Sequence, residues 1–262
     1  MVPQLTTIDY GYQEVISTAQ NAEDVLIFRV FRGKTAGQFV DIGAGDPNWD
    51  SVTNWLYRVG WRGINVEPNP DLHEILCQWR PRDINLNVGC SDSAGSLAFF
   101  QVGNGPAGQG WGLSTFDPGS ADRARALGYG VKTIEVPVQP LVDILDRCDK
   151  HSGIDVLKVD VEGQEAAVLR SGDWRRHRPA VVVAEAVVPM SAVPIINEWG
   201  HILTDADYSF VMFDGVNGWF VANEVPRSIR TQFQAFVNCN DHYRRATAAD
   251  FSRPEQGQAV GS

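Results

Sequence analysis

The chain has 262 residues, of which 44% are hydrophobic and 21% charged, the composition of a soluble globular protein long enough to bury a full core. Its net charge of −10 argues against DNA or RNA as the main partner, because polyanions are bound by clustered Lys and Arg. No apolar run approaches the roughly 18 residues of a membrane helix, and the start of the chain lacks a secretory signal pattern, so we expect no stable membrane insertion and a cytoplasmic location.

A helical cap is predicted for about the first 35 residues. Apolar residues from Ile16 to Phe31 can line one face of a helix, and polar residues such as Asn21 and Asp24 interrupt that face. At the other end, residues 253–262 are small and polar, and we expect them to be disordered. Because no repeat or linker divides the chain, residues 1–252 are predicted to form a single domain.

The stretch 38–46 is predicted to hold the first strand of a sheet and the loop after it. Residues 38–42 are a short apolar run, of the kind that forms a strand buried on both faces. Gly43 and Gly45 then let the backbone turn sharply and leave room for a ligand beside the main chain. Asp41 stands near the end of the strand, where its carboxylate can accept hydrogen bonds from a ligand at the carboxyl edge of a sheet. We therefore expect a nucleoside-containing cofactor here.

Beyond this loop, helical and strand patterns alternate, which indicates βαβ units and a parallel sheet. In chain order, the predicted elements cover residues 52–59, 61–67, 72–79, 84–88, 133–138, 141–145, 154–162, 166–169 and 180–184. Two further apolar strands, 208–213 and 219–222, flank a glycine-containing turn, and this pattern predicts an antiparallel hairpin.

The segment 103–112 has five glycines in ten residues. Nothing so rich in glycine packs as a regular element, so we expect a loop over about residues 103–130. This loop is either a plain connection or a lid over the site. The aromatic residues Trp111, Trp219 and Tyr243 are candidates for stacking on a sugar, with burial in the core as the alternative.

Two acids after later strands bear on which cofactor binds. Glu67 ends the second strand, where a carboxylate can accept both hydroxyls of an adenosine ribose, and Asp92 follows the third, within reach of an adenine edge. A nicotinamide-binding turn would have a third glycine where Asn48 stands. Acids without basic neighbours suit a sulfonium and an amino group better than a pyrophosphate, so S-adenosylmethionine is favoured. An NAD-dependent oxidoreductase acting on a sugar or nucleotide sugar is the alternative.

Three segments of this chain resemble the FkbM-type methyltransferase family. They are 39–44, 66–69 and, as the most specific signature, 155–165 with the sequence DVLKVDVEGQE. Segments 19–24 and 213–217 are also similar to family segments, so the resemblance extends from about residue 20 to 241. It implies a Rossmann-like class I methyltransferase fold of the α/β class, in which a seven-stranded, mostly parallel sheet ends in an antiparallel hairpin and has helices on both faces.

The resemblance also implies the activity, which is transfer of a methyl group from S-adenosylmethionine to a hydroxyl. We expect the acceptor to be a sugar, an oligosaccharide or a glycolipid precursor, with a polyketide or other secondary metabolite as the alternative. The oligomeric state stays open, and a homo-oligomer is compatible with the sequence. The predicted cofactor site comprises Gln20, Asp41, Gly43, Ala44, Gly45, Glu67, Pro68, Ser91 and Asp92.

Three carboxylates are the candidates for catalysis. Asp160 and Glu162 are expected to alternate along a strand and so to point to the same side, with Glu185 beside them at the end of the next strand. Converging carboxylates repel one another unless they share a proton or a cation, and oxygen ligands suit Mg²⁺ or Mn²⁺. Two interpretations stay open: the trio holds such an ion, or Glu162 caps the following helix and Glu185 binds a backbone amide. A histidine base, His151 or His201, is a further possibility.

Overall fold

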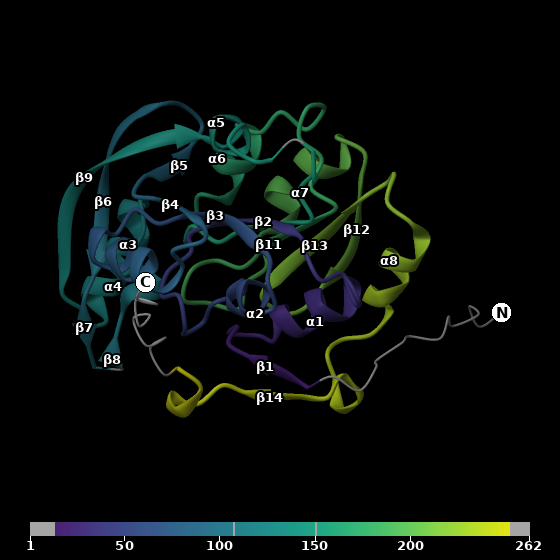
Figure 1. Cartoon of the computed structure of the whole chain (residues 1–262). Coiled ribbons are helices and arrows are strands. Elements are labelled where there is room, and N and C mark those ends of the chain that lie inside the picture. The colour runs from purple at the N-terminus through teal and green to yellow at the C-terminus, as the bar shows by residue number, and fades with distance from the viewer. Residues whose placement is uncertain (1–13, 107, 150, 252–262) are drawn as a thin grey trace, which may run out of the picture.

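A seven-stranded sheet crosses the centre of the computed structural model shown in Figure 1, which describes residues 14–106, 108–149 and 151–251. Its strand order is β12-β13-β11-β10-β2-β3-β4. The strands are β2 (Gln38–Ile42), β3 (Arg62–Val66), β4 (Ile84–Leu86), β10 (Val156–Val159), β11 (Val181–Glu185), β12 (Tyr208–Phe213) and β13 (Asn217–Ala222). Neighbours from β4 to β11 are parallel, whereas β13 is antiparallel to both β11 and β12. The predicted α/β sheet with its C-terminal hairpin is confirmed.

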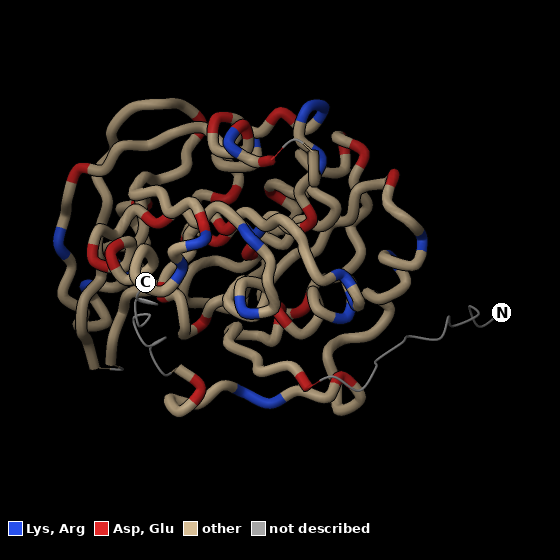
Figure 2. Tube along the Cα trace, viewed as in Figure 1, with Lys and Arg blue, Asp and Glu red and all other residues tan. Residues whose placement is uncertain are grey.

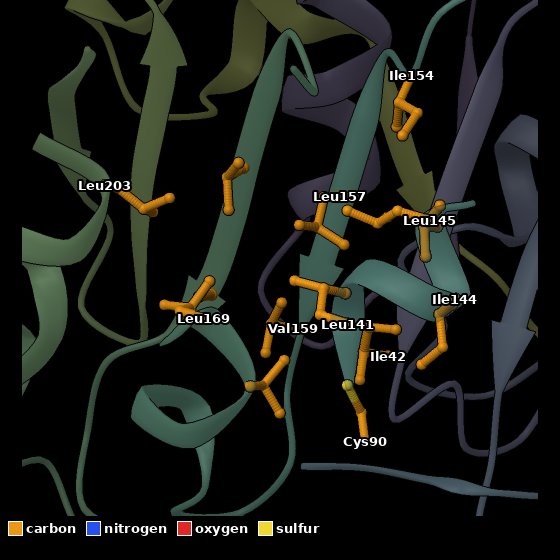
Figure 3. Close-up of a cluster of buried hydrophobic side chains, with 14 of the residues drawn as sticks. Ile42, Cys90, Leu141, Ile144, Leu145, Ile154, Leu157, Val159, Leu169 and Leu203 are labelled. Carbon is orange, nitrogen blue, oxygen red and sulfur yellow. The ribbon is translucent and has the colours of Figure 1, made fainter. Parts of the chain in front are cut away.

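Helices cover both faces of this sheet, which explains why its central strands are apolar on both sides (Figure 1). One face packs against α5 (Leu141–Leu145), α6 (Glu165–Arg170) and α7 (Ile196–Thr204). Figure 3 shows Leu141 and Leu145 close to Leu157 and Val159 in this part of the core.

The opposite face of the sheet packs against a second set of helices, which are α1 (Glu23–Val30), α2 (Asn54–Arg58) and α8 (Arg227–Thr231). Phe39, Val156 and Val183 point to this side, while Val40, Leu157 and Val182, each one position away in sequence, belong to the first core. The alternation follows from the period of two in a strand. Helices on both faces were predicted, and the structure confirms them.

A smaller sheet lies beside the main one. It has the order β5-β9-β6 and consists of β5 (Gly89–Ser91), β6 (Gly95–Val102) and β9 (Val131–Pro140), with α3 (Pro70–Trp79) preceding β4. The sequence placed 84–88 in one strand leading straight to the next loop, but the main-sheet strand ends at Leu86 and the chain then joins the other sheet. The predicted strand 133–138 is part of β9. It lies outside the main sheet, because β9 pairs with β6 as an antiparallel strand.

The region 103–130 is more regular than a loop. It contains the short pair β7 (Asn104–Gly105) and β8 (Gly108–Gln109), the 3-10 turn η1 (Trp111–Leu113) and the helix α4 (Pro118–Ala126). The side chain of Asp117 accepts a hydrogen bond from the backbone N–H of Ser120, which caps α4. The many glycines of 103–112 led to the prediction of a loop up to residue 130, but the helix α4 begins after this glycine-rich segment. Movement of this region as a lid stays a prediction.

The ends of the described chain meet on one side of the molecule. β1 (Val15–Ser17) pairs in parallel with β14 (Tyr243–Arg245), and this pair runs past α1 and α2 in Figure 1. Between residues 14 and 35 the expected helical pattern is therefore limited to α1, after a strand. Three 3-10 turns complete the structure: η2 (Gln232–Gln234), η3 (Cys239–Asp241) and η4 (Ala248–Asp250). Residues 1–13 and the predicted disordered tail, 253–262, lie outside the described residues.

The longest described helix has ten residues, and no helix within residues 14–106, 108–149 and 151–251 combines the length and apolar content needed to cross a bilayer.

Candidate active site

A cavity of about 670 Å³ opens at the carboxyl edge of the main sheet, where the loops after the parallel strands converge. Ligands of open α/β sheets bind at this edge, and the volume is that of an ordinary small-molecule site. Most of the predicted site residues line it: Gln20, Gly43, Ala44, Gly45, Glu67, Pro68, Asp160, Glu162 and Glu185.

The loop after β2 has the sharp turn that its glycines predict. Gly43 and Gly45 have φ angles of 78° and 60°, in the left-handed region that other residues avoid. A Cβ atom on Gly43 would lie 1.8 Å from the carbonyl oxygen of Asp160, so only glycine lets the loops after β2 and β10 approach so closely. The backbone N–H groups of Gly43 and Ala44 both donate to the carbonyl oxygen of Val66, which ties the loop to β3.

Glu67 supports the same loop from the end of β3. Only 5% of the residue is exposed, and its Oε2 accepts a hydrogen bond from the backbone N–H of Gly45 at 2.8 Å while Oε1 accepts one from Asn69 at 2.7 Å. Burial raises the pKa of Glu67 to about 7. Each carboxylate oxygen can accept a further hydrogen bond, so Glu67 remains able to receive ribose hydroxyls.

Asp41 lies beneath the cavity and does not line it. It is 1% exposed, and its Oδ2 accepts a hydrogen bond from the Thr53 hydroxyl at 2.8 Å. Its Oδ1 lies 3.3 Å from Nζ of Lys158, a residue that does line the cavity. The structure therefore links Asp41 to the site through this lysine. The place of Asp41 near the end of its strand suggested direct contact with a ligand, but its side chain points into the protein interior.

Lys158 joins the loops that follow β2 and β10. Its Nζ donates to the carbonyl oxygen of Gly43 and lies 3.4 Å from Oδ2 of Asp160. Burial disfavours the charged form, but Asp41 and Asp160 raise the pKa of Lys158 above its usual value, so it remains an ammonium. Its role was not predicted, although a lysine within a buried apolar strand signals a paired internal charge.

Ser91 and Asp92 are not brought into the cavity. Their neighbours Gly89 and Cys90 line it, but Asp92 is exposed and its Oδ1 accepts a hydrogen bond from the Ser93 hydroxyl at 3.1 Å. The physical reason is the departure of β5 into the smaller sheet, which turns the chain away from the carboxyl edge just before Asp92.

Asp160, Glu162 and Glu185 converge as predicted, since one oxygen atom from each lies within 4.8 Å of the others. The expected reason was wrong, because β10 ends at Val159 and the two acids lie in the following loop. Glu162 has a φ of 53°, a left-handed conformation that is strained for a residue other than glycine.

The loop that carries these acids is held by polar contacts on both sides. Oε1 of Glu165 accepts hydrogen bonds from the backbone N–H groups of Val161 and Gly163, and the Thr115 hydroxyl donates to the carbonyl oxygen of Glu162. Glu165, and not Glu162, therefore takes the backbone amides next to α6. The alternative in which Glu162 caps the following helix is therefore excluded, and the Glu162 carboxyl faces the cavity.

The carboxyl trio is electrostatically unfavourable without a ligand. Burial, together with the charges of Asp160 and Glu162, raises the pKa of Glu185 to about 10. Burial and the charge of Asp160 also raise the pKa of Glu162 well above its usual value. Oε2 of Glu185 is buried without a hydrogen-bond partner. A divalent cation fits these residues, because it would supply the missing partner and remove the repulsion.

Two polar residues at the far end of the cavity were not predicted. Oε1 of Glu23 accepts a hydrogen bond from the Asn217 side-chain amide at 2.8 Å, and both residues line the cavity. They are 194 residues apart in the chain, so no local pattern could have paired them.

Of the aromatic and histidine candidates, only one aromatic residue lines the main cavity. Trp111 lines the cavity, Trp219 is buried in the core, and Tyr243 lines a second cavity of about 220 Å³. Among the described residues that line the main cavity there is no histidine, so neither His151 nor His201 is placed to act as a base there.

The charge of the cavity is one-sided. Its described ionisable lining residues are acidic except for Lys158, whose ammonium already faces Asp41 and Asp160. Along the rest of the described chain, Figure 2 shows Lys and Arg positions interspersed with Asp and Glu positions. A cavity of this kind favours a cationic ligand and disfavours a pyrophosphate.

Comparison with protein families gives one match, in which the methyltransferase FkbM domain covers residues 41–210. This range contains most of both sides of the cavity, from the Gly43 loop to Glu185. A comparison with curated protein sequences found no match.

Three solved structures with a similar chain path are methyltransferases. A TehB-like SAM-dependent methyltransferase from Corynebacterium glutamicum is 10% identical, with a TM-score of 0.39 over 76% of this chain and 87% of that one. A precorrin-6y C5,15-methyltransferase from Geobacter metallireducens is 14% identical, with a TM-score of 0.37 over 82% and 95%. An O-methyltransferase from Bacillus cereus in complex with SAH is 13% identical, with a TM-score of 0.36 over 82% of each chain. These likenesses are weak, so the family match carries the assignment.

Proposed function

Because the chain belongs to the FkbM methyltransferase family and is thereby an S-adenosylmethionine-dependent methyltransferase of the class I fold, we propose that it methylates a hydroxyl of a sugar, an oligosaccharide or a glycolipid precursor. The observation that carries this proposal is the convergence of Asp160, Glu162 and Glu185 beside the Gly43 loop. A trio of oxygen ligands lets a divalent ion hold two neighbouring hydroxyls, which sugars offer.

The cofactor is assigned to the β2–β3 end of the cavity. In this proposal Glu67 receives the ribose hydroxyls, while the Gly43–Gly45 loop and Asp160 surround the amino-acid part. Gln20, Ala44 and Pro68 complete this part of the lining. Support comes from the acidic character of the wall, which complements the sulfonium and the ammonium of the cofactor.

The chain's own residues must then perform two tasks in the reaction. When bound, S-adenosylmethionine supplies an electrophilic methyl group, and the protein must hold the acceptor oxygen in line with it and receive a proton. Lys158 fixes Asp160 against the Gly43 loop, which sets the distance between the cofactor and the trio. Without a bound cation, the raised pKa of Glu162 makes its carboxylate a stronger base than an ordinary glutamate; a bound cation would lower that pKa and would instead activate the acceptor hydroxyl itself.

A divalent ion is the second part of the proposal. Asp160, Glu162 and Glu185 would hold Mg²⁺ or Mn²⁺, and such an ion lowers the pKa of a hydroxyl that it contacts. The unpartnered Oε2 of Glu185 supports this role. The NAD-dependent alternative has no such support, since the family is one of methyltransferases and the described residues that line the cavity include no free cation for a pyrophosphate.

The test is transfer of labelled methyl from S-adenosylmethionine to a panel of free sugars, glycolipids and small phenols. We expect label in acceptors that carry neighbouring sugar hydroxyls, with activity lost after EDTA treatment and restored by Mg²⁺ or Mn²⁺. Label confined to the phenols would overturn the sugar assignment. Activity that survives EDTA unchanged would remove the metal.

A further inference from the structure

The polar residues of the cavity follow the strand order of the sheet. From one end of the carboxyl edge to the other they are Glu67 after β3, the Gly43 loop after β2, Asp160 and Glu162 after β10, Glu185 at the end of β11, and Asn217 at the start of β13. Asn217 is the register partner of Glu185. An acceptor oxygen must approach the methyl carbon from the side opposite the sulfur, so the acceptor lies towards β11 and β13.

Glu23 stands at this acceptor end without a part in the cofactor site or the carboxyl trio. It begins α1, is 4% exposed and lines the cavity. Its Oε2 accepts a hydrogen bond from the backbone N–H of Asn21, and its Oε1 accepts one from the Asn217 amide, each at 2.8 Å. Both contacts are from neutral donors. No ion pair with a described base offsets its charge, and burial raises its pKa to about 7.

Asn217 is held so that its amide nitrogen faces carboxylates. Its Nδ2 donates to Glu23 and, at 3.3 Å, to Oδ2 of Asp214, while Asp214 also accepts a hydrogen bond from the Trp219 indole at 2.7 Å. With both amide hydrogens directed to carboxylates, the atom that Asn217 has left for a ligand is its carbonyl oxygen. With the Glu23 carboxyl ionised, Glu23 and Asn217 offer only hydrogen-bond acceptors, which selects a ligand group that donates.

The charge of the whole cavity also favours a ligand group that donates hydrogen bonds and carries a positive charge. A phosphate or carboxylate on the acceptor would meet no free cation among the described lining residues, because Lys158 is engaged by Asp41 and Asp160. An ammonium at Glu23 would instead neutralise a buried carboxylate that has only neutral partners.

Building on the function proposed above, we propose that the acceptor carries a basic nitrogen as well as the hydroxyl that is methylated, and that Glu23, with the Asn217 carbonyl, receives its ammonium group. The substrate class is therefore an amino sugar or a glycoside that contains one. Glu23 acts as a specificity-determining residue, and the same pair disfavours phosphorylated sugars.

The test measures binding of three matched probes by saturation-transfer NMR at about pH 7, with the protein saturated by S-adenosylhomocysteine and Mg²⁺. The probes are glucosamine, glucose and glucose 6-phosphate. We expect glucosamine to bind about tenfold more tightly than glucose, the difference that one hydrogen bond between charged groups supplies, and glucose 6-phosphate to bind most weakly. Glu23→Gln should abolish the preference for glucosamine and change the affinity for S-adenosylhomocysteine by less than about twofold.

Glu198→Gln is the matched control, because Glu198 is an exposed residue of α7 away from the cavity. It should leave the preference intact. Equal binding of glucosamine and glucose, a preference that survives Glu23→Gln, or binding of none of the three probes would each overturn the inference. If Glu23→Gln no longer binds S-adenosylhomocysteine, the order of the probes on the wild-type protein decides alone. Failure of the wild-type protein to bind S-adenosylhomocysteine would instead overturn the proposed function.

Discussion

The two ends of the cavity are built in different ways. At the β2–β3 end, the backbone N–H of Gly43 donates to Val66 in β3 and that of Gly45 donates to the Glu67 carboxylate, so the polar groups of the cavity wall are already paired. At the β10–β13 end, acidic side chains face one another, and Glu185 keeps a buried oxygen without a partner. The first end is preorganised for a ligand. At the second end, the repulsion between the carboxylates is removed only when they bind a cation or a proton.

The same contrast extends to the backbone. Glycines supply the left-handed conformations of the β2 loop at little cost, but Glu162 adopts one with a full side chain. Strain of this kind persists where the surrounding structure imposes it, and here it directs a carboxyl into the cavity. On the proposed assignment, cofactor binding and chemistry are separable in this molecule, and substitutions at each end should have separate effects.

The largest effect is expected from Glu185→Ala. Removing one member of the trio should lower kcat by roughly a hundredfold to a thousandfold, because the acceptor hydroxyl loses its alignment and its charge stabilisation. The affinity for S-adenosylhomocysteine should change by less than about twofold. Methyl-transfer kinetics and calorimetry check the two parts, with Glu198→Ala as the surface control. An equal loss of kcat and of cofactor affinity would mean that the two ends are not separable.

The next effect concerns the contact that joins the two ends. Gly43→Ala should lower the free energy of unfolding by roughly 3 kcal/mol, because alanine is strained at a φ of 78° and its Cβ would displace the Asp160 carbonyl.

Gly45→Ala is the matched control for that substitution, since it has a similar φ of 60° and no atom within 4 Å of an added Cβ. It should cost only about 1 kcal/mol. Urea unfolding measures both variants, and equal losses would show that the close approach of the loops contributes nothing.

A smaller effect is expected in the dependence of stability on pH. The pKa of Glu185 is raised to about 10 and those of Glu23 and Glu67 to about 7, all from an ordinary value of 4.5. The folded state therefore keeps protons that the unfolded state releases. The stabilisation from these groups is full below pH 4.5 and is lost as pH rises through the folded pKa values.

Thermal unfolding between pH 5.5 and 9 measures this loss, with EDTA-treated protein expected to become steadily less stable as pH rises. Mg²⁺ should raise Tm more at pH 9 than at pH 6, because it competes with fewer protons at the trio. A Tm in EDTA that does not fall with pH, or a Mg²⁺ effect independent of pH, would contradict the account of the acceptor end.

The same division explains what the sequence could reveal. Gly43, Gly45 and Glu67 were predicted because each stands just after its own strand, and parallel strands bring their carboxyl ends to one edge. That rule also brought Asp160 and Glu185 together, although it assumed a longer β10. It failed for Asp92, since no local pattern shows β5 leaving the main sheet.

The acceptor end depends on contacts between distant segments. Glu23 meets Asn217 only after the turn between β12 and β13 has folded against residues 21–23, where Asn21 also donates to the Asp214 carbonyl. Lys158 acquired its role from two carboxylates whose positions depend on separate loops. Sequence periodicity predicts each element but not which distant loops will share a polar contact, and the proposed specificity depends on those contacts.

The separation of the two ends is tested most directly by calorimetry on a reciprocal pair of variants. Glu67→Ala should weaken binding of S-adenosylhomocysteine by about tenfold or more, through the loss of hydrogen bonds to a charged group, and should leave Mn²⁺ binding unchanged. Glu185→Ala should do the reverse, losing Mn²⁺ while keeping the affinity for S-adenosylhomocysteine. If each variant weakened both ligands equally, or if Glu67→Ala left S-adenosylhomocysteine bound as tightly as before, the account of a cofactor end and an acceptor end would be contradicted.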